Sequence, residues 1–373
     1  MTERFDALVI GAGMAGASLA AELGMDASVL LLEMEDQPGY HTTARSAACF
    51  IESYGNATVC KLNRASRRDL ESPPSDVFTG SVLSPRGMLY LARPGNEGEL
   101  QALLDVAPGV REIPLAEAKE RVPILRTEAL ARTAIEPDAM DIDVNTLHQG
   151  HLKRLKRAGG RLLCEAPAER LSRDGGAWRV ETRAGDFTAE VLVNAAGAWA
   201  DRIAEAAGLA KIGLTPLRRS AVIVPPPEAH AVASWPATAD IAEGFYFKPE
   251  AGRLLLSPAD ETPVEPHDAY PEDMDIAQGI DRFEQCVDFE VRRVERSWAG
   301  LRTFAPDRTP VAGFDQDAPG FFWLAGQGGF GIQTSPAMSK LAAGLIRGTG
   351  LPDELAALDF DPKAVDPSRF RAP

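Results

Sequence analysis

Three glycines near the start of the chain have the spacing of a phosphate-binding turn. Gly11, Gly13 and Gly16 form the pattern G-x-G-x-x-G within GAGMAG, and an acidic residue, Glu33, follows further along. In such a turn the first glycine permits the tight bend, the second lets a pyrophosphate approach the backbone, and the third lets a helix pack closely on a sheet. A carboxylate at the position of Glu33 can accept hydrogen bonds from an adenosine ribose and would repel a 2′-phosphate, which argues against NADP.

The segments around this turn are those that a dinucleotide-binding fold requires. Residues 7–10 are predicted to form an apolar strand, residues 15–23 a helix of strong helix formers, and residues 28–32 a second apolar strand. Free N–H groups and partial positive charge at the start of the helix would stabilise the phosphates. The order strand, turn, helix, strand, acid therefore predicts a dinucleotide site rather than a turn that serves only the backbone.

The segment after Glu33 favours FAD over NAD. An NAD enzyme usually completes its doubly wound sheet within roughly the next hundred residues. Here residues 37–50 (QPGYHTTARSAACF) form a loop of small residues that can lie against a flat ring system. A further strand is predicted only at 191–194, before a helix at 198–207. A third glycine cluster at 326–331 follows a strand at 321–325 and opens a helix that runs to about residue 346.

Length and charge restrict the class of protein. A chain of 373 residues suggests two domains, and a net charge of −15 makes nucleic acid and anionic membrane surfaces poor partners. The four cysteines show no metal-binding spacing, and no apolar run is long enough to cross a bilayer. Together with an N-terminus that does not resemble a secretion signal, these features predict a cytoplasmic protein with neither a metal nor a membrane-spanning segment.

Several motifs taken together resemble those of the D-amino-acid oxidase and glycine oxidase family of FAD-dependent oxidoreductases. They are GAGMAG with Glu33, HTTARSAA, VLVNAAGAW and GQGGFGIQTSPAM. Within that family the chain is most similar to bacterial D-arginine dehydrogenase, through PGYHTTARSAA, LHQG, LRRSA, FYFKP, LSPADETPVEPHD and SWAGLR in the same order. The likeness runs from Asp6 to about Leu345.

The resemblance implies an α/β fold in which a Rossmann-type FAD-binding domain is interleaved with an α+β substrate domain built on an antiparallel sheet. The FAD-binding domain would comprise residues 1–80, 130–210 and 300–373, and the substrate domain residues 81–129 and 211–299. The second substrate segment agrees with this, since residues 220–224, 244–248 and 252–257 read as short strands and residues 275–286 as a covering helix. Residues 168–189 read as a small β-meander attached to the FAD-binding domain.

The same resemblance assigns the substrate-binding residues. An enzyme that oxidises an amino acid must hold its carboxylate, and the planar fork of a buried arginine matches a carboxylate with two parallel hydrogen bonds. The resemblance implies that Arg302 and Arg219 take this role and that the hydroxyl groups of Tyr246 and Tyr54 add hydrogen bonds. The expected partner is therefore a small amino-acid substrate, with quinone or oxygen left open as the electron acceptor.

The cofactor contacts are likewise carried over by motif. The predicted FAD-binding residues are Gly11, Ala12, Gly13, Met14, Ala15, Gly16, Glu33, Met34, Thr42, Thr43, Arg45, Ser46, Ala47, Ala48, Ala168, Ala195, Ala196, Gly197, Trp199, Gly328, Gly329, Phe330, Gly331, Ile332, Gln333 and Thr334. Related sarcosine oxidases attach their flavin to a cysteine after the arginine-bearing strand, where this chain reads Thr303-Phe304-Ala305-Pro306. FAD is therefore predicted to bind noncovalently. His148 and His151 lie on a predicted amphipathic helix and are interpreted as surface or packing residues.

Departures from D-arginine dehydrogenase concern the substrate side chain. Cys49 replaces a histidine, residues 84–88 (SPRGM) lack the acid that would pair with a guanidinium, and Ala237 and Ala239 replace larger residues. A buried cation without a partner costs a few kcal/mol. With Gly87 and Gly329, these residues are predicted to form a pocket for a neutral or apolar side chain.

The predicted activity is FAD-dependent oxidative deamination of a D-amino acid by hydride transfer from Cα to flavin N5, which gives an imino acid and then a 2-oxo acid. Three alternatives stay open: a glycine or sarcosine-type secondary-amine oxidase, a 2-hydroxy-acid dehydrogenase that uses the same arginine clamp, and a non-catalytic flavin-binding protein.

Overall fold

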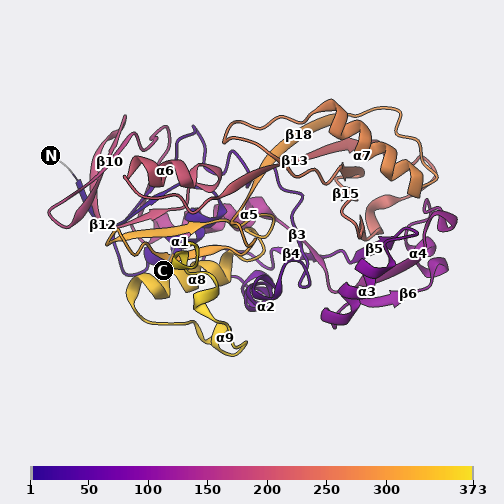
Figure 1. Ribbon diagram of the computed structural model, residues 1–373, viewed down its shortest axis with the longest axis horizontal. Coiled ribbons are helices and arrows are strands. Elements are labelled where there is room, and N and C mark those ends of the chain that lie inside the picture. Colours follow the sequence, from indigo (N-terminus) through magenta and orange to yellow (C-terminus); the bar gives the residue numbers. More distant parts are fainter. Residues whose placement is uncertain (1–2, 372–373) are drawn as a thin grey trace.

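The computed structural model describes residues 3–371, and one end of the molecule is built on a mainly parallel sheet (Figure 1). Among these residues, β10 (Arg170–Asp174), β11 (Ala177–Thr182), β12 (Gly185–Asn194), β1 (Glu3–Ile10), β2 (Val29–Leu32) and β9 (Arg161–Leu163) lie in that order, with β20 (Phe321–Ala325) beside β12 and β19 (Val311–Phe314) beside β20. Strand β1 is parallel to both β12 and β2, β2 is parallel to β9, and β20 is parallel to β12. Strand β11 pairs in antiparallel fashion with β10 on one side and with the first half of β12 on the other, which is the predicted meander.

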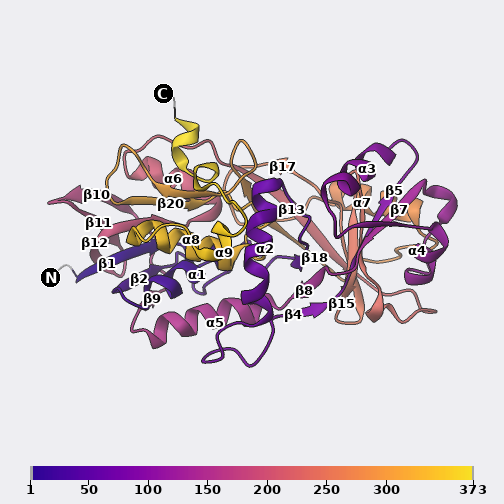
Figure 2. The same cartoon turned by 90° about the horizontal axis from the view of Figure 1, so that it is seen from below.

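Helices cover both faces of this sheet because its strands bury side chains on both sides, as in other parallel sheets. On one face Val9 and Leu31 pack with Leu19 of α1 (Met14–Leu23) and Leu341 of α8 (Ser335–Arg347), and α5 (Val144–Arg157) packs on α1. On the other face α6 (Ala200–Ala206) packs over the neighbouring strand residues. Figure 1 shows α6 and α8 on opposite sides of the strands of this sheet, and Figure 2, seen from below, looks onto the side where α8 lies.

A second sheet occupies the other end of the molecule (Figure 1). Its strands lie in the order β17 (Thr262–Pro263), β13 (Thr215–Val224), β16 (Arg253–Ser257), β15 (Tyr246–Glu250), β14 (Ala237–Asp240), β5 (Met88–Ala92), β7 (Arg132–Glu136) and β6 (Arg111–Ile113), and β18 (Arg296–Phe304) also pairs with β13. All pairs are antiparallel except β14 with β5. Helix α7 (Asp273–Cys286) covers it through Phe283, which packs edge-on against Phe245 and Phe247.

A small third sheet, further helices and several 3₁₀ turns complete the fold. A small sheet contains β3 (Cys49–Phe50), β8 (Met140–Ile142) and β4 (Leu83–Pro85). The other helices are α2 (Ala57–Glu71), α3 (Glu97–Val106), α4 (Leu115–Arg121) and α9 (Asp353–Ala356), and the 3₁₀ turns are η1 (Thr127–Ala129), η2 (Gly197–Trp199), η3 (Val232–Ser234), η4 (Pro362–Ala364) and η5 (Pro367–Phe370). Among residues 3–371, no helix combines the length and the apolar character that crossing a bilayer requires.

The predicted fold class is confirmed, and two helix boundaries differ from expectation. The helix expected at 198–207 is divided into η2 and α6. The last glycine cluster does not open a helix directly, because Gly326 and Gly328 have φ values of 69° and 50° and therefore lie outside the right-handed helical region. Helix α8 begins only at Ser335, which leaves a coiled segment that faces a cavity.

The division into two domains remains our proposal, and the sheets support it in outline. Strands of the first sheet come from the beginning, middle and end of the chain, and most strands of the second sheet come from the two predicted insertions. Two strands cross the proposed limits, since β7 joins the second sheet after residue 130 and β18 runs past residue 300. We therefore propose that the chain passes from the substrate domain back to the FAD-binding domain after Glu136, and again near the end of β18.

Candidate active site

A cavity of about 390 Å³ is lined by residues from both large sheets. Most predicted cofactor residues line it: Gly11, Gly13, Met14, Ala15, Glu33, Met34, Thr42, Thr43, Arg45, Ser46, Ala47, Ala168, Ala195, Ala196, Gly197, Trp199, Gly328, Gly329, Gly331 and Ile332. Arg219, Tyr246 and Arg302 line the same cavity. The fold thus gathers the dinucleotide motif and the two candidate carboxylate ligands around one space.

The first glycine turn is shaped by contacts that leave no room for side chains. Gly11 has a φ of 101°, and a Cβ atom there would lie 2.5 Å from the carbonyl oxygen of Ala195. A Cβ atom on Gly16 would lie 1.9 Å from the carbonyl oxygen of Gly11, so Gly16 serves helix packing and does not line the cavity. Ala12 also lies behind the lining, and its N–H donates to Glu33 Oε2 at 3.0 Å.

Glu33 ends β2 as a buried carboxylate at the cavity wall. Besides Ala12, the N–H of Glu35 donates to it at 3.1 Å. Burial raises the pKa of Glu33 above its ordinary value, although these backbone hydrogen bonds oppose the shift. A buried acceptor at the end of the second parallel strand fits the ribose-binding role that the sequence predicts.

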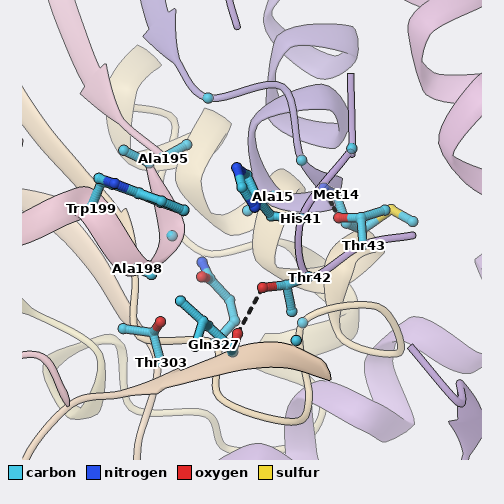
Figure 3. Close-up of a pocket in the computed structure, with 18 of the residues that line it drawn as sticks. Met14, Ala15, His41, Thr42, Thr43, Ala195, Ala198, Trp199, Thr303 and Gln327 are labelled. Atoms are coloured by element: carbon cyan, nitrogen blue, oxygen red, sulfur yellow. Dashed lines mark hydrogen bonds between the residues drawn. The ribbon is translucent and has the colours of Figure 1, made fainter. Parts of the chain in front are cut away.

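The loop after Glu33 is tied across the end of β18. The hydroxyl of Thr42 donates to the carbonyl of Leu301 at 2.7 Å, and that of Thr43 accepts from the N–H of Met14 at 3.0 Å (Figure 3). The guanidinium of Arg45 bonds Asp268 at 2.5 Å and also donates to the carbonyl of Ala299, so it holds the loop as well as lining the cavity. Ala48 lies outside the lining and packs in an adjacent apolar cluster.

The glycine turn before α8 forms the opposite wall. A Cβ atom on Gly328 would lie 2.2 Å from the ring of Phe304, and one on Gly329 would lie 2.9 Å from Arg302 Nη1. Three predicted residues of this turn, Phe330, Gln333 and Thr334, do not line the cavity. Phe330 packs on Tyr54, and Thr334 donates to the carbonyl of Phe330. Gln333 hydrogen-bonds Ile51 and Asn63.

Arg302 and Arg219 approach each other because β18 pairs with β13. Arg219 is opposite Gly300, so Arg302 lies two residues further along the same face. Nη1 of Arg302 donates to the hydroxyl of Tyr54 at 3.1 Å. Burial acts to lower the pKa of the Arg302 guanidinium. Tyr54, Tyr246 and the carboxylate of Glu261 nevertheless raise this pKa overall, so the group stays a cation.

Arg219 has a protein partner that sequence reasoning missed. Its Nη2 donates to Glu261 at 2.9 Å, and Arg308 bonds the same carboxylate. Burial acts to raise the pKa of Glu261, but Arg308 and Arg219 lower it overall, so Glu261 is an anion. Arg302, in contrast, has only Tyr54 as a hydrogen-bond partner within residues 3–371.

Of the residues predicted for the side-chain pocket, Gly329 lines the cavity, whereas Cys49, Gly87, Ala237 and Ala239 do not. Cys49, Ala237 and Ala239 pack in one apolar cluster with Met88 and Tyr90. Ala239 pairs with Tyr246 across β14 and β15, which puts the cluster beside the cavity end. Burial raises the pKa of the Cys49 thiol to about 11, so it is uncharged at neutral pH. Gly87, with a φ of 75°, lies against Pro236 and hydrogen-bonds Ala237.

Two further polar residues point to a cofactor that spans the cavity. Thr303 and Gln327 line it (Figure 3), and Thr303 Oγ1 and Gln327 Nε2 are buried atoms without a hydrogen-bond partner among the described residues. Buried polar groups are normally satisfied, so these two atoms fit a polar ligand there. Together with the glycine walls and Glu33, they match the donor and acceptor set that FAD needs. Although Gln327 lies in the last glycine motif and Thr303 follows Arg302, only the three-dimensional surroundings show that these two side chains lack partners.

Other lining residues were not among those predicted to bind FAD. His41, within the loop at residues 37–50, packs its ring 4.6 Å from that of Trp199 (Figure 3), and Tyr40, Pro167, Ala198, Arg202 and Leu301 complete much of the wall. Nε2 of His148 donates to the carbonyl oxygen of Ala12 at 2.9 Å, consistent with a packing role beneath the first glycine turn. The described residues contain no group of three or more His, Cys, Asp or Glu side chains placed to hold a metal ion.

Comparison with known proteins gives a consistent result. The family model described as FAD dependent oxidoreductase matches residues 6–345. Glycine oxidase of Geobacillus kaustophilus is 25% identical over 93% of this chain and 94% of its own, and its crystal structure superimposes with a TM-score of 0.82 over 94% of this chain and 96% of its own. L-proline dehydrogenase from P. horikoshii has a TM-score of 0.84 at 21% identity, over 99% and 98% of the two chains. The FAD-bound L-alpha-glycerophosphate oxidase from Mycoplasma pneumoniae has a TM-score of 0.83 at 18% identity, over 93% and 95%.

Proposed function

The chain belongs to the family of FAD-dependent oxidoreductases, and from that premise we propose that it oxidatively deaminates a D-amino acid with a neutral or apolar side chain. One observation carries the proposal. The guanidinium of Arg302, which has a single protein partner in the described chain, lines the same cavity as the dinucleotide-binding loops. A cation placed there can hold a small carboxylate next to the cofactor.

The residues around Arg302 suggest how a substrate would be oriented. In this proposal the fork of Arg302 binds the carboxylate, and hydrogen bonds come from the hydroxyl of Tyr246, which lines the cavity, and from that of Tyr54, which lies behind the lining and accepts from Arg302. Arg219 adds positive charge, although Glu261 holds part of its fork. Fixing one end of a small substrate in this way limits the positions of its Cα atom, and such orientation supplies much of the rate in reactions of this kind.

The chemistry itself belongs to the cofactor, which accepts a hydride from Cα when bound. We propose that FAD is held noncovalently, because Thr303 rather than a cysteine follows Arg302. No side chain is required as a base in this proposal, since the substrate ammonium can lose its proton to water. The imino acid then leaves and is hydrolysed to a 2-oxo acid and ammonia.

The surroundings of Cys49 support a neutral substrate side chain. Asp141, the carboxylate beside Cys49, is already bonded by Arg86 at 2.7 Å and by Lys248 at 2.8 Å. It therefore has little capacity to pair with a cationic substrate group, and leaving such a group buried without a partner is costly. The adjacent Ala237 and Ala239 offer small apolar contacts instead.

A second candidate is glycine or a small secondary amine. The cavity stops at Tyr246 and does not include the side-chain cluster around Ala237, which favours a substrate with little or no side chain. The similar glycine oxidase from Geobacillus kaustophilus supports the same candidate. A 2-hydroxy acid would use the same clamp, and a flavin-binding protein without turnover is the remaining alternative.

An anaerobic bleaching screen tests these candidates together. The FAD-loaded protein is mixed with D- and L-amino acids, N-methylated amino acids and 2-hydroxy acids, and loss of flavin absorbance is followed. We expect D-methionine, D-leucine or D-phenylalanine to bleach faster than D-arginine or D-lysine. Faster bleaching by the cationic amino acids would overturn the side-chain assignment, and no bleaching by any compound would favour the binding protein. Peroxide formation under air, compared with reduction of a quinone or dye, identifies the acceptor.

A further inference from the structure

The segment that carries Tyr54 is held by one buried amide. Residues 51–54 form no helix or strand, and their backbone carbonyl groups turn toward Asn63 of α2. Nδ2 of Asn63 lies 3.3, 3.2 and 3.0 Å from the carbonyl oxygens of Ile51, Glu52 and Tyr54. Asn63 has no exposed surface, so water cannot replace these bonds.

A second amide connects this segment to the glycine turn on the other side of the cavity. Oε1 of Gln333 accepts from the N–H of Ile51 at 3.0 Å, and its Nε2 donates to Oδ1 of Asn63 at 2.9 Å. Gln333 is also buried. Asn63 and Gln333 therefore join the Tyr54 segment to the turn that contains Gly329, although these parts are far apart in the sequence.

The network ends at the substrate clamp. The Tyr54 ring packs edge-on against Phe330 at 5.0 Å, and its hydroxyl accepts from Arg302 at 3.1 Å. The hydroxyl can hold that position only while the backbone of residues 51–54 is fixed. We propose that Asn63 is a positioning residue, which sets Tyr54 against Arg302 before a carboxylate binds. This inference deepens the proposed function and rests on it.

Loss of the amide has a defined consequence. In Asn63→Ala the carbonyl groups of Ile51, Glu52 and Tyr54 lose their common donor, the segment moves to find other partners, and Tyr54 leaves its place in the clamp. The hydrogen bond of Tyr54 within the charged clamp is then lost, and the Kd of a bound carboxylate should rise about tenfold or somewhat more. FAD affinity should not change, since Asn63 does not line the cavity.

A double-mutant cycle with Tyr54→Phe distinguishes positioning from a general structural role. The FAD-loaded wild type, Asn63→Ala, Tyr54→Phe and the double variant are titrated with benzoate as a monocarboxylate probe, and the flavin absorbance change gives its Kd. We expect Asn63→Ala to raise the Kd about tenfold in the wild type and less than about twofold once Tyr54 is phenylalanine. The same factor in both backgrounds, or no change in the wild type, would overturn the inference.

Ser66→Ala is the matched control. Ser66 is a fully buried polar residue of the same helix, and its hydroxyl accepts from the N–H of Ala337 at 3.1 Å, away from residues 51–54. Its loss should leave the benzoate Kd within about twofold, as expected for sites without shared partners.

If Asn63→Ala does not fold, Gln333→Leu removes the other anchor and enters the same cycle. Binding of the probe needs no turnover. If the bleaching screen identifies no substrate, only the proposed function is refuted. If the wild type binds no monocarboxylate, both the proposed function and the role of Asn63 are refuted.

Discussion

The substitution Arg302→Lys separates the charge of this side chain from its shape. Nη1 of the guanidinium donates to the hydroxyl of Tyr54 at 3.1 Å, and the other N–H groups of Arg302 have no hydrogen-bond partner among residues 3–371. They are therefore free to form a forked pair with a carboxylate, whereas an ammonium would form one bond. Because a hydrogen bond to a charged group contributes about 1.5–3 kcal/mol and 1.4 kcal/mol is a factor of ten, kcat/KM should fall about 10- to 150-fold.

Steady-state turnover of whichever substrate the bleaching screen identifies, with an artificial dye as acceptor and saturating FAD, measures this effect. The FAD Kd and the thermal midpoint of the variant should match those of the wild type, because the charge is kept. Arg296→Lys is the matched control, since Arg296 lies on the same strand, is exposed and stacks on Trp298. An exposed contact of this kind contributes little, so kcat/KM should stay within about threefold.

The reasoning fails if Arg302→Lys keeps kcat/KM within about threefold of the wild type while binding FAD normally, because the fork would then add no binding energy. An equal loss in Arg296→Lys would also count against it. That result would show that charge or strand stability, and not the geometry of the clamp, governs the rate.

Three further predictions concern cofactor binding and stability. Gln327→Leu should raise the FAD Kd about 2- to 12-fold by removing a neutral hydrogen bond, and an unchanged Kd in a fluorescence titration would mean that Nε2 faces no polar ligand. Glu33→Gln should raise the FAD Kd about tenfold at neutral pH. Since burial raises the pKa of Glu33, wild-type affinity should decline as acid protonates this carboxylate, whereas the variant should show a flatter profile; parallel profiles would contradict the ribose assignment. Burial lowers the pKa of His151 to about 3, so between pH 6.5 and 3 the unfolded chain binds a proton that the folded chain does not, and stability falls by about 1.4 kcal/mol per pH unit as pH decreases. His151→Leu should remove this dependence in urea unfolding at pH 7 and pH 5, and an unchanged slope would show that His151 is accessible to protons.

The fold and the cofactor class were readable from the chain because both depend on local pattern. Apolar runs at 7–10 and 28–32, the turn at Gly11 to Gly16 and the acid at Glu33 act over short distances, and the resulting elements β1, α1 and β2 appear close to their predicted places. The start of α8 was missed, although its end was predicted within one residue, because Gly326 and Gly328 take positive φ values and the ring of Phe304 lies where a side chain on Gly328 would be, which is a tertiary contact.

The arrangement of the site depended on tertiary structure. The types and motifs of Arg302, Arg219 and Tyr54 indicated a carboxylate clamp, but only the pairing of β18 with β13 and the packing of residues 51–54 decide which arginine stays open. Glu261 occupies Arg219, and Asn63 holds the segment of Tyr54, through hydrogen bonds between residues far apart in the chain. Sequence by itself thus determined which chemical groups are present and the elements that carry them. Their partners, and hence the free or occupied state of each charge, were decided by long-range packing, because a hydrogen bond needs its two atoms within about 3 Å and no local pattern specifies that distance.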